Sequence, residues 1–209
     1  KNLRQNRKNK RFVYLISPNK IKNEEFYTKL NQVLSSKKVS FFQLRLKKES
    51  LKKKICIGKK IKKICKKYQV KFLINDNPEI AKKVNADGCH LGQNDMNILH
   101  ARKILKNKII GITCHNSIDL AKKAISNGAN YLAFGAFYPS KTKKVKYKAS
   151  LKILRLAKKL TNTPIVAIGG IKDTNYKKLL LNKANFLAIS GYIWNNKKLN
   201  PKEAINKFI

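Results

Sequence analysis

Eight short apolar segments alternate with helical patterns from one end of this chain to the other. Each segment is apolar on both faces, which is typical of strands buried in a parallel sheet. We expect strands at Phe12–Ser17, Phe41–Leu46, Lys71–Asp76, Gly88–Gly92, Ile109–Cys114, Tyr131–Phe137, Pro164–Gly170 and Asn185–Ser190. No other feature limits the fold so strongly.

Amphipathic patterns fill the gaps between these segments. The clearest runs from Leu51 to Tyr68, where apolar residues at three- and four-residue spacing form one stripe and lysines, including Lys52–Lys54, cover the other side. We expect the other helices at Glu24–Leu34, Pro78–Val84, Ile98–Leu105, Ile118–Ser126, Ser150–Leu160, Asn175–Leu181 and Pro201–Phe208. Ser117 and Asp173 are the expected N-caps of two of them.

Eight strand–helix units predict an α/β fold of one closed (β/α)8 barrel, a TIM barrel, over residues 12–209. The 209 residues are close to the lower limit for that fold, so the loops must be short. An open doubly wound sheet is the alternative, but it would normally place a glycine-rich turn after the first strand, where this chain has Ser17-Pro18-Asn19-Lys20. Residues 1–11 are expected to be a frayed basic arm.

The charge is strongly unbalanced, with 49 Lys and Arg against 10 Asp and Glu, a formal net charge of +39. This excludes an acidic binding module and raises the alternative of a nucleic-acid-binding protein. However, 43 of the basic residues are lysines, many of them on predicted helix exteriors, whereas nucleic-acid binders favour arginine-rich or aromatic-interleaved patches. We therefore attribute most of the charge to codon bias and expect small-molecule ligands, with no nucleic acid.

Four cysteines show no metal-binding spacing and are expected to be free thiols of a cytoplasmic protein. No apolar run is long enough to span a membrane. A homo-oligomer is compatible with the sequence, which leaves the oligomeric state open.

In such a barrel the chemistry lies at the carboxyl ends of the strands, where all the loops of one face meet. Two of the ten acids, Asp76 and Asp95, follow neighbouring strands there. Paired carboxylates suit a hard cation such as Mg²⁺. Two salt-bridged carboxylates are the alternative. Asp87 precedes its strand and is expected at the opposite end of the barrel.

Cations at the same face are suited to a polyphosphate. Arg45, Lys47 and Lys143 can neutralise it, and Arg45 can grip it with a bidentate fork. Gly169-Gly170 and Ser190-Gly191 follow two further strands and suit a phosphate cradle, or equally tight turns. His90, inside its strand, is expected to be a packed core histidine.

Seven ordered motifs together resemble the thiamine-phosphate synthase family, also called thiamine-phosphate pyrophosphorylase. They are FQLRLK, LINDNPEIA, NADGCHLGQND, IIGITCH, FGAFYPSKTKK, PIVAIGGI and FLAIS. The resemblance runs from about Phe12 to Ile193. It implies a transferase that joins 4-amino-5-hydroxymethyl-2-methylpyrimidine diphosphate to hydroxyethylthiazole phosphate, giving thiamine phosphate and diphosphate by a dissociative, Mg²⁺-assisted substitution.

The resemblance also implies roles for residues. Catalytic stabilisation of the leaving group falls to Arg45, Lys47 and Lys143, and the metal ligands are Asp76 and Asp95. The pyrimidine diphosphate would be bound by Gln43, Leu44, Arg45, Leu46, Lys47, Asn75, Thr113 and Lys143. The thiazole phosphate would be bound by Ser140, Lys141, Thr142, Gly170, Ile189 and Ser190.

This chain departs from the family pattern at a few positions. Thr113 and Ser140 each exchange one hydroxyl residue for another, and Ala136 stands where proline is frequent. At NDNPE the chain also lacks a nearby cation that is usual in the family, but none of the differences removes a charged group from the proposed site. The related thiazole tautomerase branch is the nearest alternative, but its members generally lack the full diphosphate and Mg²⁺ set that is present here.

Overall fold

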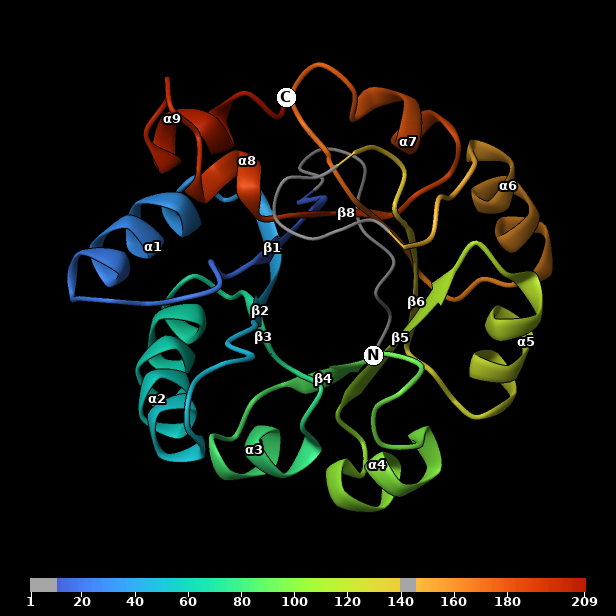
Figure 1. The fold of residues 1–209 in the computed structure, drawn as a ribbon, viewed down its shortest axis with the longest axis horizontal. Helices are drawn as coiled ribbons and strands as arrows, with labels where there is room; N and C mark the ends of the chain where they lie inside the picture. The colour runs from blue at the N-terminus through green and yellow to red at the C-terminus, as the bar shows by residue number, and fades with distance from the viewer. Residues whose placement is uncertain (1–10, 140–145) are drawn as a thin grey trace.

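A computed structural model describes residues 11–139 and 146–209, which form a closed barrel of parallel strands surrounded by helices (Figure 1). The strands are β1 (Val13–Ile16), β2 (Val39–Leu44), β3 (Lys71–Asn75), β4 (Gly88–Leu91), β5 (Ile109–His115), β6 (Tyr131–Gly135), β7 (Ile165–Ile168) and β8 (Phe186–Ile189). The helices are α1 (Glu25–Ser35), α2 (Leu51–Lys67), α3 (Pro78–Lys83), α4 (Ile98–Leu105), α5 (Ile118–Ser126), α6 (Leu151–Leu160), α7 (Lys177–Leu181), α8 (Gly191–Trp194) and α9 (Pro201–Asn206).

The strands follow one another around the barrel in chain order, and β8 closes the ring by pairing in parallel with β1. This confirms the predicted (β/α)8 barrel and excludes the open doubly wound sheet. Every predicted strand is present, with ends that differ by a few residues. None of the helices within the described residues is long and apolar enough to cross a bilayer.

The core has two layers because each strand is buried on both faces. The larger layer lies between the sheet and the surrounding helices. The smaller one fills the barrel interior and includes Tyr14, Phe41, Leu73, Tyr131 and Phe186. Closing the sheet also leaves no free strand edge.

Helix α2 differs from its prediction at its first turns. Ile61 is buried as predicted, but Leu51 is 52% exposed, and Ile57, which was not part of the predicted stripe, is buried. Lys54 lies three residues before Ile57 and seven before Ile61, so helical geometry puts it on the inner stripe, and it is half-buried. The prediction that Lys54 belongs to the solvated face is wrong.

Two side chains that follow β8 donate hydrogen bonds to backbone carbonyls at the end of β1. Ser190 Oγ donates to the carbonyl of Ser17 (3.1 Å), and the indole Nε1 of Trp194 donates to the carbonyl of Ile16 (2.7 Å). Trp194 belongs to α8, a short helix that sequence patterning did not predict. These bonds reinforce the closure between β1 and β8.

One of the two predicted caps is confirmed. Ser117 accepts from the backbone of Leu120 and caps α5. Asp173 does not cap α7, because that helix begins later than predicted and Tyr176 is its N-cap residue. Asn175 instead organises the preceding turn, accepting from the backbone of Lys172 and donating to the carbonyl of Gly170.

Asp87 lies at the amino-terminal end of the barrel, as its position before β4 predicted. Its Oδ2 accepts from the backbone of Phe72 (2.9 Å) and from the ammonium of Lys62 (2.8 Å).

Replacing Asp87 with alanine leaves the backbone N–H of Phe72 without its partner. We expect the free energy of unfolding to fall by about 1–3 kcal/mol. Urea unfolding measures it, with exposed Asp119→Ala as a control that should cost less than about 1 kcal/mol. Equal losses in both variants would contradict the structural role.

Candidate active site

The end of β2 carries two cationic side chains to the carboxyl face of the barrel. Arg45 is half-buried, and its backbone N–H donates to Ser17 Oγ (2.9 Å). Its guanidinium donates to the neutral amide oxygen of Asn19 (3.3 Å). No carboxylate among the described residues forms an ion pair with Arg45. The fork is therefore available to an anion.

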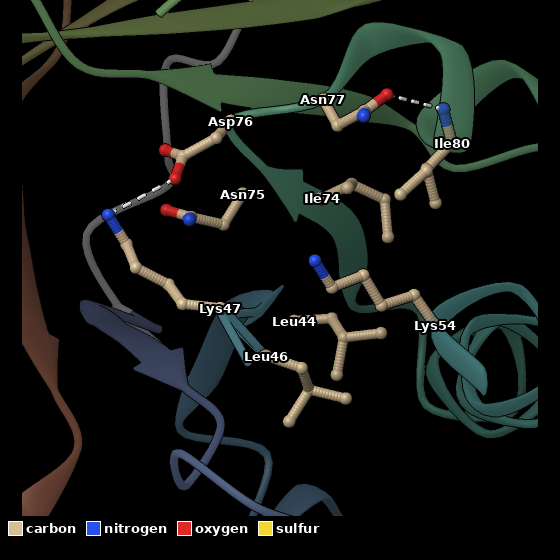
Figure 2. Close-up of a pocket in the computed structure, with 9 residues that line it drawn as sticks. All are labelled: Leu44, Leu46, Lys47, Lys54, Ile74, Asn75, Asp76, Asn77 and Ile80. Carbon is tan, nitrogen blue, oxygen red and sulfur yellow. Dashed lines mark hydrogen bonds and ion pairs between the residues drawn. The ribbon is translucent and has the colours of Figure 1, made fainter. Parts of the chain in front are cut away.

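Asp76 follows β3 with a left-handed backbone (φ 63°), which aspartate tolerates better than most residues. Its N–H donates to the carbonyl of His90 (2.8 Å), which joins the ends of β3 and β4. Its Oδ2 lies 3.3 Å from the Lys47 ammonium (Figure 2). The next residue, Asn77, caps α3 by accepting from Ile80 (2.9 Å), so the carboxylate stands on a fixed turn.

Asp95 is the second carboxylate of the predicted pair, and it lies in contact with the Asp76 side chain. The backbone of Gly92 donates to its Oδ2 (2.7 Å). Partial burial and the adjacent Asp76 carboxyl raise the pKa of Asp95. Two adjacent carboxylates repel each other when both are charged, and a dication would neutralise both. The residues present therefore fit Mg²⁺. Within the described residues no third His, Cys, Asp or Glu joins them, which leaves the other positions to water and substrate oxygens.

A cavity of about 220 Å³ opens beside Asp76 (Figure 2). Its apolar floor is formed by Leu44, Leu46, Ile74 and Ile80, and its polar lining by Lys47, Lys54, Asn75, Asp76 and Asn77. The structure thus gathers five of the predicted site residues around one space. Lys54 reaches into it from α2, a contribution that sequence reasoning missed. Its spacing from Ile57 and Ile61 was the signal that could have revealed it.

Gln43 and Thr113 lie deeper, around the barrel interior. Gln43 is 3% exposed and donates to Tyr14 Oη (2.7 Å). Thr113, at the end of β5, has its hydroxyl 2.8 Å from His90 Nε2. His90 is a hydrogen-bonded interior residue, in agreement with its predicted role. Burial lowers the pKa of His90 to about 4, with the Asp76 charge opposing and the Arg45 charge adding to the effect.

Three of the predicted thiazole phosphate residues, Gly170, Ile189 and Ser190, lie across the barrel from β3 and β4, at the ends of β7 and β8. Gly170 has φ 60°, and a Cβ there would come within 2.2 Å of the Pro139 carbonyl oxygen, so only glycine fits. Ile189 is buried and Ser190 is the N-cap residue of α8. Ser140, Lys141, Thr142 and Lys143 lie outside the described residues.

Comparison with known proteins identifies the family. A family model described as thiamine monophosphate synthase matches residues 13–193. A curated thiamine-phosphate synthase from Pelagibacter ubique is 73% identical over 205 residues, covering 98% of this chain and 99% of that protein. The chain belongs to the thiamine-phosphate synthase family. This synthase is therefore a transferase of thiamine biosynthesis, as the ordered motifs predicted.

More distant relatives agree. A thiamine-phosphate synthase from Nitrosomonas eutropha is 38% identical, covering 85% of this synthase and 84% of its own chain. The solved thiamine phosphate pyrophosphorylase from Pyrococcus furiosus superposes with a TM-score of 0.82 at 27% identity, covering 97% of this chain and 95% of its own. The fold and the family assignment thus rest on similarities of both sequence and structure.

Proposed function

We propose that this synthase joins the pyrimidine diphosphate to the thiazole phosphate by a dissociative substitution at the site around Arg45, Lys47, Asp76 and Asp95. The bond between the pyrimidine methylene carbon and the diphosphate oxygen breaks first, and the oxygen keeps the electron pair. The thiazole nitrogen then donates its lone pair to the methylene cation. The products are thiamine phosphate and diphosphate.

The observation that carries this proposal is the concentration of opposite charges at neighbouring strand ends. Lys47, Asn75 and Asp76 line one cavity. The guanidinium fork of Arg45, which has no carboxylate partner among the described residues, follows the adjacent strand. Such preorganised cations stabilise negative charge as it develops on a leaving group. The chemistry needs no protein nucleophile.

Asp76 and Asp95 would hold Mg²⁺, which when bound neutralises diphosphate oxygens as a Lewis acid. Arg45, Lys47 and Lys143 then supply fixed positive charge to the same group. We assign the remaining pyrimidine diphosphate contacts to Gln43, Leu44, Leu46, Asn75 and Thr113. We assign the thiazole phosphate to Ser140, Lys141, Thr142, Gly170, Ile189 and Ser190, which would align the thiazole nitrogen for attack.

The direct test is to incubate purified protein with Mg²⁺ and both substrates and to follow thiamine phosphate and diphosphate together. We expect equal amounts of the two products, and none when either substrate is left out. Isomerisation of a thiazole precursor without thiamine phosphate would instead support the tautomerase branch.

Lys54 is expected to add binding energy for the diphosphate. Its side chain lines the same cavity as Lys47, so Lys54→Met removes a positive charge from the wall while keeping most of the side-chain length. We expect the KM for the pyrimidine diphosphate to rise about tenfold. Steady-state kinetics check this against Lys52→Met, whose lysine is exposed on the same helix and should leave KM unchanged. Identical KM values for both variants would remove Lys54 from the site.

We further place this synthase in the cytoplasm, with its phosphorylated substrates as partners and without nucleic acid. Three of its four free cysteines are buried, which suits a reducing compartment. Saturable DNA binding with a steep salt dependence would contradict the partner assignment. Light scattering on the purified protein determines whether it is a homo-oligomer.

A further inference from the structure

A continuous line of hydrogen bonds crosses the barrel interior beneath the proposed diphosphate site. Gln43 Nε2 donates to Tyr14 Oη over 2.7 Å, and Tyr14 Oη lies 2.8 Å from Tyr131 Oη. Tyr131 Oη lies 2.8 Å from His90 Nδ1, and His90 Nε2 lies 2.8 Å from Thr113 Oγ1. The two ends of this line are residues assigned above to the substrate, whereas the three middle residues have no assigned role.

One end of this line of hydrogen bonds is buried in the barrel, and the other end lies where the barrel opens to solvent. Gln43, Tyr14 and Tyr131 are each 3% exposed or less, and the tyrosine rings pack against Phe41. Thr113 is half-buried at the end of β5, where the barrel opens. A hydroxyl hydrogen without an acceptor inside the protein would therefore cost free energy at the buried Tyr14 end. At the open Thr113 end it would not, because water or a ligand can accept it.

Counting hydrogens fixes the direction of the bonds. Tyr14, Tyr131, neutral His90 and Thr113 carry one hydrogen each on the atoms involved, and three links join them. Tyr14 already accepts from Gln43, so its own hydrogen must go to Tyr131 or remain buried without an acceptor. By the same argument, Tyr131 must donate its own hydrogen to His90 Nδ1. His90 then carries its hydrogen on Nε2 and donates to Thr113.

Only this arrangement leaves the spare hydrogen on Thr113, at the open end. With the Gln43 amide donating to Tyr14, every other arrangement leaves a donor without a partner inside the barrel, which costs about 1–3 kcal/mol. Within the described residues, every buried side-chain nitrogen and oxygen has a hydrogen-bond partner, in agreement with this arrangement.

We propose that His90 is a positioning residue: held as the Nε2–H tautomer by Tyr131 and Tyr14, it makes the Thr113 hydroxyl a donor aimed at a diphosphate oxygen. This inference rests on the proposed function for the identity of the anion. His90 itself does not touch substrate. The interior line prevents the hydroxyl from turning its hydrogen inward, so no reorientation is needed when the anion arrives.

The tautomer can be measured directly in the unmodified protein without any ligand. The chain has only three histidines, so ¹⁵N-histidine labelling gives few signals, and the spectrum of His90→Gln assigns the one of interest. Long-range ¹H–¹⁵N correlation at neutral pH is expected to show hydrogen on Nε2 and none on Nδ1. An Nδ1–H tautomer or a doubly protonated ring would overturn the proposal.

The coupling of His90 to Thr113 is tested by a double-mutant cycle that uses inorganic diphosphate with Mg²⁺ as the probe. Calorimetric titration of Thr113→Val is expected to show about tenfold weaker binding, and His90→Leu a similar loss. The double variant should bind no more weakly than either single variant. Unchanged binding in either single variant, or losses that multiply in the double variant, would overturn the proposal.

Two further variants separate hydrogen bonding from folding. His90→Gln keeps a terminal amide that can donate to Thr113, so its diphosphate binding should stay within about threefold of the unmodified protein. A loss as large as that of Thr113→Val would overturn the proposal. Tyr68→Phe removes a hydroxyl bonded to Asn31 outside the barrel and should leave binding unchanged. Because tautomer and diphosphate binding are measured without turnover, failure of the proposed synthesis would be distinguishable from failure of this inference.

Discussion

Arg45→Ala is expected to lower kcat/KM by about 10²- to 10³-fold while the thermal unfolding temperature stays within a few degrees. The Arg45 side chain bonds a neutral amide rather than a carboxylate, so its positive charge is not neutralised within the site. Removing it takes away a donor whose interaction strengthens as charge develops on the departing diphosphate. The fold is little affected, because the backbone bond to Ser17 remains.

Two further variants serve as comparisons for Arg45→Ala. Arg45→Lys keeps the charge but not the fork, so it should recover part of the lost activity. Arg155→Ala removes an exposed arginine on α6 that donates to Asn182, and its activity should match that of the unmodified protein. Nearly normal turnover in Arg45→Ala would exclude the proposed leaving-group site.

Asp76→Asn and Asp95→Asn are expected to weaken Mg²⁺-dependent catalysis by several kcal/mol, on the order of 10²- to 10³-fold in rate. Each substitution keeps the shape of the side chain but removes one of the two charges that face the cation. Activity measured against Mg²⁺ concentration should show a higher half-saturating concentration in both variants. Loss of Asp76 also releases Lys47 from its ion pair.

Asp119→Asn is the matched control for both metal variants, because Asp119 is exposed in the first turn of α5 and should not change the Mg²⁺ curve. Circular dichroism confirms that the variants are folded. Two Mg²⁺ curves identical to that of the unmodified protein would show that Asp76 and Asp95 are only salt-bridged carboxylates, the alternative that spacing alone allowed.

The fold was largely predictable because parallel strands buried on both faces leave an unmistakable apolar signal. Strands β6 and β8 were both predicted from such runs, as Tyr131–Phe137 and Asn185–Ser190. Ends of elements were harder, because they depend on local turns. The start of α7 is set by Asn175, whose bonds to Lys172 and Gly170 delay the helix beyond the position that Asp173 suggested.

The site was predictable where strand ends alone place a residue, and unpredictable where a second element contributes. Asp76 and Asp95 are in contact because β3 and β4 are neighbours. Lys54 comes from a helix; among so many lysines composition does not mark it, and only its spacing from Ile57 and Ile61 indicates that it faces inward. The partners of His90 come from β5 and β6, and which interior residues meet depends on register around the barrel, which spacing along the chain does not reveal.

The pairing of β1 with β8 has a consequence for synthesis on the ribosome. Val13 pairs with Leu187 and Leu15 with Ile189. Strand β1 therefore cannot complete its backbone pairing until β8 has been synthesised. Until that segment emerges, the nascent chain has unpaired edges on β1 and β7, and Ser17 lacks the Ser190 hydroxyl bonded to its carbonyl. Catalytic competence therefore arrives only after β8 has been synthesised. Chaperones that shield strand edges would act on this protein during that interval.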